Sequence, residues 1–331
     1  MLNDGPIRGY DNSDLENFVS DIDRFGFVDR SQTTISFDSD TYVFTLARTG
    51  TYFEYYILGQ LCVITTDKTL QLPGSPPDAA TYHIYINTLD GTLSYSLSDW
   101  DLTENYTLVA IIIFNSTLIP KYILLDERHT CKIDRSMHRY LHFSRGTQVI
   151  TPGTLSDYSV PVAGPSGNDD NTFSITSCVI ADEDIFHTLD SITDPDGDTL
   201  VYPIVYRTSS TEWSWVLSEV PFRYTAAGYI QWDNVGTMTQ GSSANYYNTY
   251  LLAATNGYII ISGRGEFASL ATAQAENFSL FDMTGFEIEE AIAIYQFTWL
   301  TNNAYSTRGK CKLAATPANI LISITSGKVK K

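Results

Sequence analysis

Length, composition and charge already exclude several classes of protein. The chain has 331 residues, of which 43% are hydrophobic and 18% charged, so it is long enough to bury more than one core and too apolar to be disordered. Its 38 acidic and 20 basic residues give a formal net charge of −18, which argues against nucleic-acid binding because that requires clustered Lys and Arg.

The opening residues, MLNDGPIRGYDNSDLENF, contain neither a basic nor an apolar segment, so no secretory signal is expected. The longest apolar run, residues 108–114, is far shorter than the roughly 20 residues that a bilayer requires, and we expect no membrane insertion. The four cysteines lie far apart, without the spacing of a zinc site, and are expected to be buried, reduced thiols. They are Cys62, Cys131, Cys178 and Cys311.

The first half of the chain predicts a series of strands, favoured by its many Tyr, Thr, Ser and Ile residues. Residues 41–66 alternate between apolar and polar side chains with a break at a Thr-Gly pair, and the proline-rich residues 72–77 predict a loop. Residues 81–100 hold two alternating runs on either side of Asp90-Gly91, a dipeptide that supplies the positive φ angles of a tight turn, so a hairpin is expected. Residues 106–117 then predict a buried strand.

The second half predicts another β domain. Residues 151–171 are rich in Pro, Gly, Ser and Asp, and we expect a linker there between a domain of residues 1–150 and a domain of residues 172–331. Apolar residues three and four apart predict one helix near 266–281, and residues 288–300 predict a closing strand. The expected fold class is mainly β: two antiparallel β-sandwich-like domains with one or two short helices.

The segment 126–146 differs from the rest because it holds three of the five histidines and several basic residues. If Asp134 caps a short helix, His138 and His142 share one face of it. That spacing suits zinc, but Arg139 replaces the glutamate base of the H-E-x-x-H motif, so no metal is expected. We predict a structural turn and helix that end the first domain, with basic groups paired locally or against an acidic neighbouring subunit.

Other residues capable of catalysis or binding lie in expected turns and strands. Asp182-Glu183-Asp184 and residues 194–198 gather carboxylates, but a glycosidase or a calcium site needs a fixed spatial arrangement that adjacency alone does not supply. No nucleophile motif or phosphate-binding glycine loop is found, so neither enzyme activity nor a cofactor is expected. Trp213, Trp215 and Trp232 are candidates for stacking on sugar rings, although core or interface positions are the simpler interpretation.

Two motifs carry a resemblance to a known family. The first is E-R-H followed by an Asp, H-x-x-L-H and R-G-T within residues 124–147, and the second is I-A-D-E-D-I at residues 180–185. In this order they resemble a module of tailed-bacteriophage virion proteins of the tail-fibre or fibre-like type, over roughly residues 20–300. The residues that carry the resemblance are Glu127, Arg128, His129, Asp134, His138, Leu141, His142, Gly146, Ala181, Asp182, Glu183, Asp184 and Ile185.

The resemblance implies a structural protein of the virion, made in the host cytoplasm, that forms part of a fibre or of a tail or head appendage. It implies that the partners are other virion proteins, such as portal, tail or capsid components, and that the chain forms a homo-oligomer, with a trimer favoured. Two alternatives stay open at this point. One is a receptor-binding protein that recognises a host surface glycan or protein, and the other is a polysaccharide depolymerase that uses a pair of carboxylates.

Overall fold

The computed structural model describes residues 24–100, 106–132, 137, 140–141, 144–193, 197–286, 288 and 290–324. The chain divides into two compact units whose ranges are interleaved. Unit 1 contains Met1–Leu72, Tyr82–Ile111 and Glu127–Arg139, and unit 2 contains Pro73–Thr81, Ile112–Asp126 and Tyr140–Lys331. Two short stretches of the first half and residues 140–150, all expected in the first domain, cluster with unit 2.

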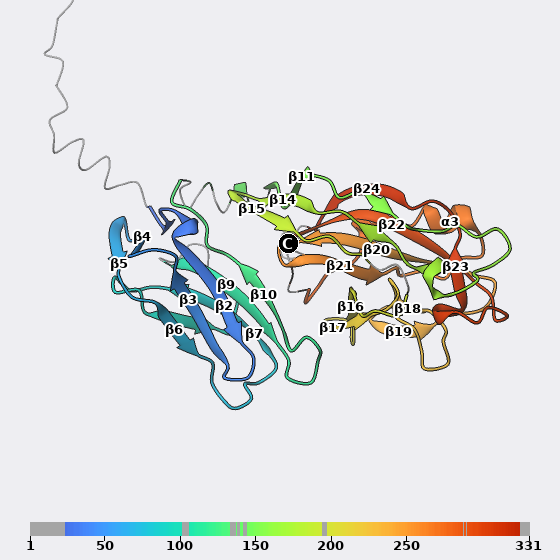
Figure 1. The fold of residues 1–331 in the computed structure, drawn as a ribbon, viewed down its shortest axis with the longest axis horizontal. Coiled ribbons are helices and arrows are strands. Elements are labelled where there is room, and N and C mark those ends of the chain that lie inside the picture. Colours follow the sequence, from blue (N-terminus) through green and yellow to red (C-terminus); the bar gives the residue numbers. More distant parts are fainter. Residues whose placement is uncertain are drawn as a thin grey trace, which may run out of the picture. The chain divides into compact units, whose positions relative to one another are not determined.

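The first half of the chain folds into short strands, which Figure 1 shows in blue to green. They are β1 (Gly26–Phe27), β2 (Thr33–Asp38), β3 (Val43–Arg48), β4 (Phe53–Ile57), β5 (Gln60–Ile64), β6 (Lys68–Gln71), β7 (Ala80–Ile86), β8 (Leu93–Ser96), β9 (Thr107–Phe114) and β10 (Tyr122–Asp126), with the 3-10 helix η1 (Arg30–Gln32) after β1. Their sheets have the orders β1-β4-β5, β2-β3-β6 and β10-β9-β7-β8.

The expected hairpin and buried strand are both confirmed. Strand β7 pairs antiparallel with β8, and Gly91 in the connecting turn has a φ of 75°. The Asp90 carboxylate accepts hydrogen bonds from the Thr88 hydroxyl (2.8 Å) and from the Thr92 backbone (3.0 Å), and these bonds hold the pKa of Asp90 at about 2. Strand β9 is buried at six of its eight positions, as a continuous apolar run predicts.

The second half of the chain folds into further strands and short helices. The strands are β11 (Gln148–Thr151), β12 (Leu155–Ser156), β13 (Ser174–Ile175), β14 (Cys178–Asp182), β15 (Ile185–Leu189), β16 (Tyr202–Arg207), β17 (Trp213–Ser218), β18 (Gln231–Asn234), β19 (Thr237–Gln240), β20 (Tyr246–Ala254), β21 (Gly257–Ser262), β22 (Ala291–Thr301), β23 (Cys311–Leu313) and β24 (Ala318–Ser323). The helices are α3 (Leu270–Gln274), η2 (Asn168–Asn171), η3 (Phe278–Leu280) and η4 (Arg308–Lys310).

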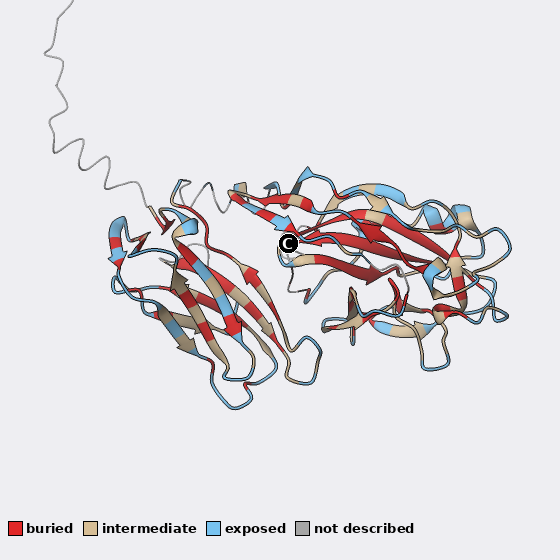
Figure 2. Ribbon diagram, viewed as in Figure 1, coloured by how far each residue is buried: buried red, intermediate tan, exposed pale blue. Residues whose placement is uncertain are grey.

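The centre of unit 2 is a seven-stranded sheet with the order β17-β16-β21-β20-β22-β23, in which β24 also pairs with β22. Its pairs are antiparallel except for β16 and β21, which run parallel. Strand β20 is buried at eight of nine positions, and Figure 2 shows buried residues (red) along most of β20, β21 and β22. Side chains of this sheet, such as Leu251 and Phe297, share one core with Ile180 of β14. The mainly antiparallel β class expected from the sequence is therefore confirmed.

The helix expected near 266–281 is shorter than its apolar spacing predicts. Backbone groups of Phe267 pair with Tyr246 of β20 at 2.8 and 3.0 Å, so Phe267 continues the sheet instead of a helix. Ser269 then caps α3 by accepting a hydrogen bond from the Thr272 backbone (3.2 Å), and Asn277 begins a separate 3-10 turn. Local capping and strand pairing thus override the helical periodicity.

Residues 151–171, expected as a linker, are partly packed into unit 2. Strand β12 lies in this range and pairs with β13, and η2 ends it. Asn171 at the end of η2 is fully buried, and its side chain donates to the Cys311 carbonyl at 2.9 Å. Turn-forming residues in a row are therefore compatible here with a fixed, buried connection.

Candidate functional site

The E-R-H segment, the main candidate from the sequence, forms part of the strand framework of unit 1. The Phe27 backbone N–H donates to the His129 carbonyl (2.8 Å), the Cys131 N–H donates to the Phe27 carbonyl (2.8 Å), and Phe27 forms a parallel bridge with Thr130. Gly26 has a φ of 94°, and a Cβ there would lie 2.6 Å from the His129 carbonyl oxygen. Glycine is needed at this close approach of two backbones.

Arg128 is buried and binds backbone oxygens of unit 1. Its Nη1 donates to the Thr33 carbonyl (2.5 Å), to the Thr33 hydroxyl (2.7 Å) and to the Arg30 carbonyl (3.1 Å). The side chains of Glu127 and His129 on either side are also buried, with Oε2 and Nε2 3.7 Å apart. These contacts tie the segment to η1 and β2, which is a structural role for Arg128.

Four further candidates of this segment, Asp134, His138, Arg139 and His142, lie outside the described residues. The described positions around them, 137, 140, 141 and 144, are helical, and the Arg145 N–H donates to the Leu141 carbonyl at 2.8 Å. The short helix expected after residue 134 is therefore present at the positions that the structure describes.

The acidic candidates Asp182, Glu183 and Asp184 lie in unit 2 at the turn of a hairpin. Strands β14 and β15 pair antiparallel up to Asp182 and Ile185, so Glu183 and Asp184 form the two-residue connection. Glu183 has a φ of 51°, Asp182 is 1% exposed, and the other two are half-buried. The turn expected from the sequence is present, although it is more buried than a solvated acidic turn.

The three tryptophans proposed as sugar platforms are largely covered by unit 2 itself. Trp215 is 8% exposed, and the half-buried Trp232 packs against the core. The half-buried Trp213 makes an edge contact with Phe286 at 4.9 Å between ring centres, and its indole N–H donates to the Thr284 carbonyl at 3.0 Å. Trp213 and Trp215 also line a pocket of about 450 Å³ in unit 2, whereas Trp232 packs against the core.

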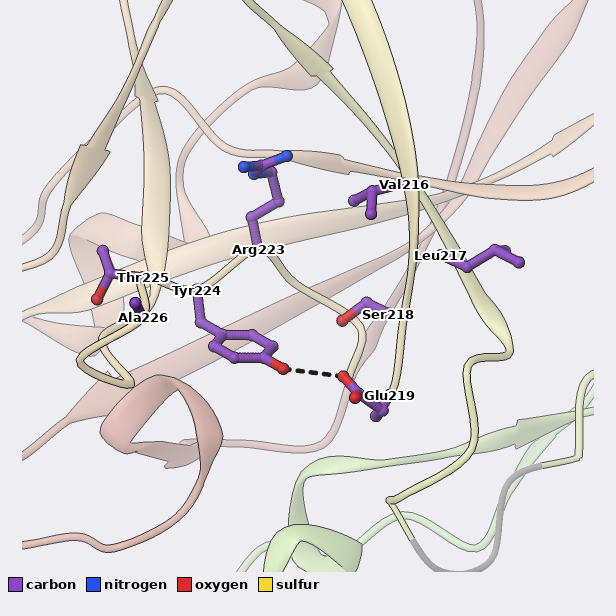
Figure 3. Close-up of a pocket in the computed structure, with 8 residues that line it drawn as sticks. All are labelled: Val216, Leu217, Ser218, Glu219, Arg223, Tyr224, Thr225 and Ala226. Atoms are coloured by element: carbon purple, nitrogen blue, oxygen red, sulfur yellow. Dashed lines mark hydrogen bonds between the residues drawn. The ribbon is translucent and has the colours of Figure 1, made fainter. Parts of the chain in front are cut away.

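A pocket of about 280 Å³ opens in unit 2 between the end of β17 and the segment that follows it (Figure 3). Eight residues line it: Val216, Leu217, Ser218, Glu219, Arg223, Tyr224, Thr225 and Ala226. Figure 3 shows Arg223 and Val216 at one end of this ring of side chains and Tyr224 with Glu219 at the other. The lining thus combines apolar, hydroxyl and charged groups, as small-ligand sites do.

Tyr224 and Glu219 form a fixed pair at one end of the pocket. The Tyr224 hydroxyl donates to Glu219 Oε2 at 2.9 Å, and burial together with this bond to Glu219 raises the pKa of Tyr224 above its ordinary value. Arg308 lies behind the pair, with Nη2 3.9 Å from Glu219 Oε1 and Nη1 2.9 Å from Asp198 Oδ1. Glu219 is the one carboxylate among the eight lining residues, whereas glycoside hydrolysis uses two across a cleft.

Arg223 provides the positive charge at the other end. Its guanidinium stacks on Tyr206, with Cζ 3.7 Å from the ring centre, and its Nε lies 3.5 Å from Gln231 Oε1. The sequence analysis did not predict this pocket. The signal that could have found it is the Arg-Tyr pair at 223–224, because it places a charge and a ring in a short connection between strands.

A second group of charged residues in unit 2 is buried or half-buried and is paired within the fold. Arg207 Nε and Nη2 donate to the two carboxylate oxygens of Asp233 at 2.7 and 3.1 Å, and Arg264 Nε lies 3.4 Å from the same carboxylate. The Glu276 carboxylate accepts from the Arg264 backbone (2.7 Å) and from the side chains of Asn248 and Tyr250. These bonds join β16, β18 and β20 to the segments that follow β21 and α3, so this group is structural.

Comparison with protein-family models, with curated proteins and with solved structures found no match to this chain. Among the described residues, none of the helices has the length and apolar character needed to cross a membrane.

Proposed function

We propose that the protein is a structural component of a tailed-bacteriophage virion, of the fibre-like or appendage type, that forms a homo-oligomer and docks onto other virion proteins. One observation supports this more than any other: described residues of both motifs occupy framework positions. Arg128 binds three backbone or hydroxyl oxygens within unit 1, and Asp182 to Ile185 close a hairpin of unit 2. Motif residues that maintain a scaffold fit a structural protein.

The position of the chain in an intact particle tests this proposal. Antibodies raised against the purified chain, used for gold labelling of the phage that encodes it, are expected to decorate the tail, collar or head appendage. Light scattering coupled to gel filtration is expected to give three times the monomer mass. A chain that is monomeric and absent from purified particles would contradict the proposal.

The framework role of the motif has its own test. Arg128→Met is expected to destabilise unit 1 by about 3 kcal/mol or more, because it leaves buried carbonyl and hydroxyl oxygens without their charged donor. Lys132→Met, an exposed position in the same segment, is the matched control and is expected to change stability by less than about 0.5 kcal/mol. Equal unfolding midpoints in urea for both variants would argue against the role.

A second function, recognition of a host surface molecule, is favoured by the pocket of Figure 3. Its mixture of Tyr, Arg and Glu side chains suits a polar ligand, and its single lining carboxylate favours binding over hydrolysis. Binding of the labelled chain to host cells, lost on mild periodate oxidation of surface glycans, is the expected result. Release of reducing ends from host polysaccharide would instead support the depolymerase alternative.

A further inference from the structure

The Arg223 end of the pocket has hydrogen-bond donors that no residue in the described part of the chain accepts from. The Arg223 Cζ lies over the Tyr206 ring, 3.7 Å from its centre, and Figure 3 shows the guanidinium at the end of the pocket away from Glu219. Its Nε makes one long contact, 3.5 Å, to Gln231, and among the described residues the two Nη groups have no hydrogen-bond partner. A stacked guanidinium with a free edge is already oriented for a planar, two-oxygen acceptor.

The other end of the pocket offers acceptors. Glu219 receives one hydrogen bond on Oε2 from Tyr224 and has Arg308 3.9 Å from Oε1, which leaves lone pairs on both oxygens. Arg308 also interacts with the Tyr224 hydroxyl, so the acceptors that stay available at this end are the oxygens of Glu219. A ligand that spans the pocket therefore contacts the Arg223 cation at one end and hydrogen-bond acceptors at the other.

The volume limits the size of that ligand. At about 280 Å³ the pocket lies just below the range of about 300–1,000 Å³ that is typical of small-molecule sites, so it accommodates one small unit. The half-buried side chain of Val216 provides an apolar surface beside the polar ends, whereas the Leu217 side chain points away from them (Figure 3).

The geometry points to a site for a carboxylate-bearing, hydroxylated ligand of monosaccharide size, with its carboxylate held by the Arg223 edge and its hydroxyl groups donating to Glu219. This inference deepens the second function proposed above, because it names the class of ligand that the pocket recognises. A phosphate would also suit a guanidinium, but the Glu219 carboxylate at the far end favours a singly charged ligand with neutral donors.

The probes are glucuronate, glucose and inorganic phosphate, added to the full chain and followed by ligand-observed saturation-transfer NMR. Glucuronate is expected to bind at least about tenfold more tightly than glucose, since only glucuronate makes the charge-assisted bonds. Equal binding of the two sugars would overturn the carboxylate assignment. Tighter binding of phosphate than of glucuronate would overturn the part played by Glu219.

Variants at Arg223 test whether this residue binds glucuronate. Arg223→Gln is expected to reduce glucuronate affinity about tenfold or more, and Arg223→Lys to reduce it nearly as much, because an ammonium cannot form the planar two-bond contact. Arg145→Gln removes the same charge from an exposed position that does not line the pocket and is expected to bind like the original chain. Circular dichroism confirms that each variant is folded. Unchanged affinity in Arg223→Gln would refute the site.

The outcomes also separate this inference from the functions on which it rests. If the chain binds host glycans but not glucuronate, the ligand class is wrong and the recognition function stands. If the chain binds glucuronate through Arg223 but is absent from virions, the site stands and the virion proposal fails.

Discussion

Arg207 and Arg223 both lie against an aromatic ring in unit 2, but of the two only Arg207 has a carboxylate partner among the residues that the structure describes. Arg207 is 3% exposed, has its Cζ 5.9 Å from the centre of the Trp213 ring, and holds both oxygens of Asp233. Arg223 is half-buried, stacks at 3.7 Å on Tyr206, and has one long contact to an amide. The same side chain thus serves as a closed structural clamp at one place and as an open donor edge at the other.

Burial and internal hydrogen bonds distinguish a charge that stabilises the fold from a charge that binds a ligand. Removing a buried charge from water costs several kcal/mol, and this cost is offset only when hydrogen bonds satisfy the group within the fold. A half-buried arginine meets a smaller cost because water can reach it, so its donors need no internal partner. Buried, paired arginines such as Arg207 should therefore control stability, and half-buried arginines such as Arg223 should control ligand binding.

The largest expected effect comes from breaking the buried ion pair between Arg207 and Asp233. Asp233→Asn keeps the shape of the side chain but leaves the buried Arg207 without its counter-charge, and it places an amide opposite the Gly236 N–H, which now donates to Asp233 at 2.8 Å. We expect a loss of about 3–5 kcal/mol in the free energy of unfolding, measured in urea.

The control for this change is Asp198→Asn. Its carboxylate also binds an arginine, Arg308, at 2.9 Å, but the Asp198 side chain is 70% exposed. The expected loss is about 0–1 kcal/mol. Similar losses for the two variants would mean that burial does not distinguish the two kinds of arginine pair.

The next largest effect is a change in how stability depends on pH. Burial raises the pKa of the Glu276 carboxyl, although bonds from Asn248 and from the Arg264 backbone act in the opposite direction. The folded state therefore holds the Glu276 proton more tightly than the unfolded state. The stabilisation from this protonation is fully present below the unfolded pKa of about 4.3, and it is lost as the pH rises through the pKa of Glu276 in the folded state.

Glu276→Gln removes this titration, so its stability relative to the original chain is expected to rise as the pH increases from about 4. Urea unfolding at several pH values between about 4 and 8 measures the trend, with the exposed position Glu212→Gln as control. A constant difference between Glu276→Gln and the original chain over this range would contradict the prediction.

A smaller effect is expected from removing the ring beneath the open arginine. Tyr206→Leu keeps an apolar side chain in β16 but removes the face that Arg223 stacks on, so we expect a stability loss of about 0.5–1 kcal/mol. Glucuronate binding should weaken less than in Arg223→Gln, because the guanidinium remains but is less oriented. Binding as weak as in Arg223→Gln would show that the ring, and not the charge, governs recognition.

The smallest effect is expected at Arg308, behind the pocket. Arg308→Gln breaks a partly exposed pair with Asp198, a 2.8 Å bond to the Gly197 carbonyl and a 3.9 Å contact with Glu219, so stability should change by about 1 kcal/mol or less. Binding of glucuronate should stay close to that of the original chain. A marked loss of binding would mean that Arg308, and not Arg223, supplies the carboxylate site.

Local patterns predicted the fold better than they predicted the sites. The Asp90-Gly91 hairpin, the buried strand of residues 106–117 and the closing strand at 288–300 each depend on neighbouring residues, and the structure has a strand or hairpin at all three. The helix at 266–281 was overestimated because the pairing of Phe267 with Tyr246 joins residues about twenty positions apart, which periodicity does not register.

The sites depend on still more distant contacts. Arg128 contacts Thr33 across 95 positions of sequence, and Arg207 contacts Asp233 across 26. Composition alone therefore could not distinguish an arginine that is paired within the fold from one that is free to bind a ligand. The sequence did single out Arg128 by its motif, but it could not show that the side chain is buried. Arg223 belonged to no motif, and only the fold gives it a ring on one face and a pocket beside its edge.

The bridge between Phe27 and Thr130 has a consequence for biosynthesis. Strand β1 pairs with β4 on one side, but on its other side it receives the E-R-H segment, which follows it by about one hundred residues. During translation, β1 must wait until residue 131 has left the ribosome before its second edge is covered, so nascent chains shorter than this expose an uncompleted strand edge to other chains.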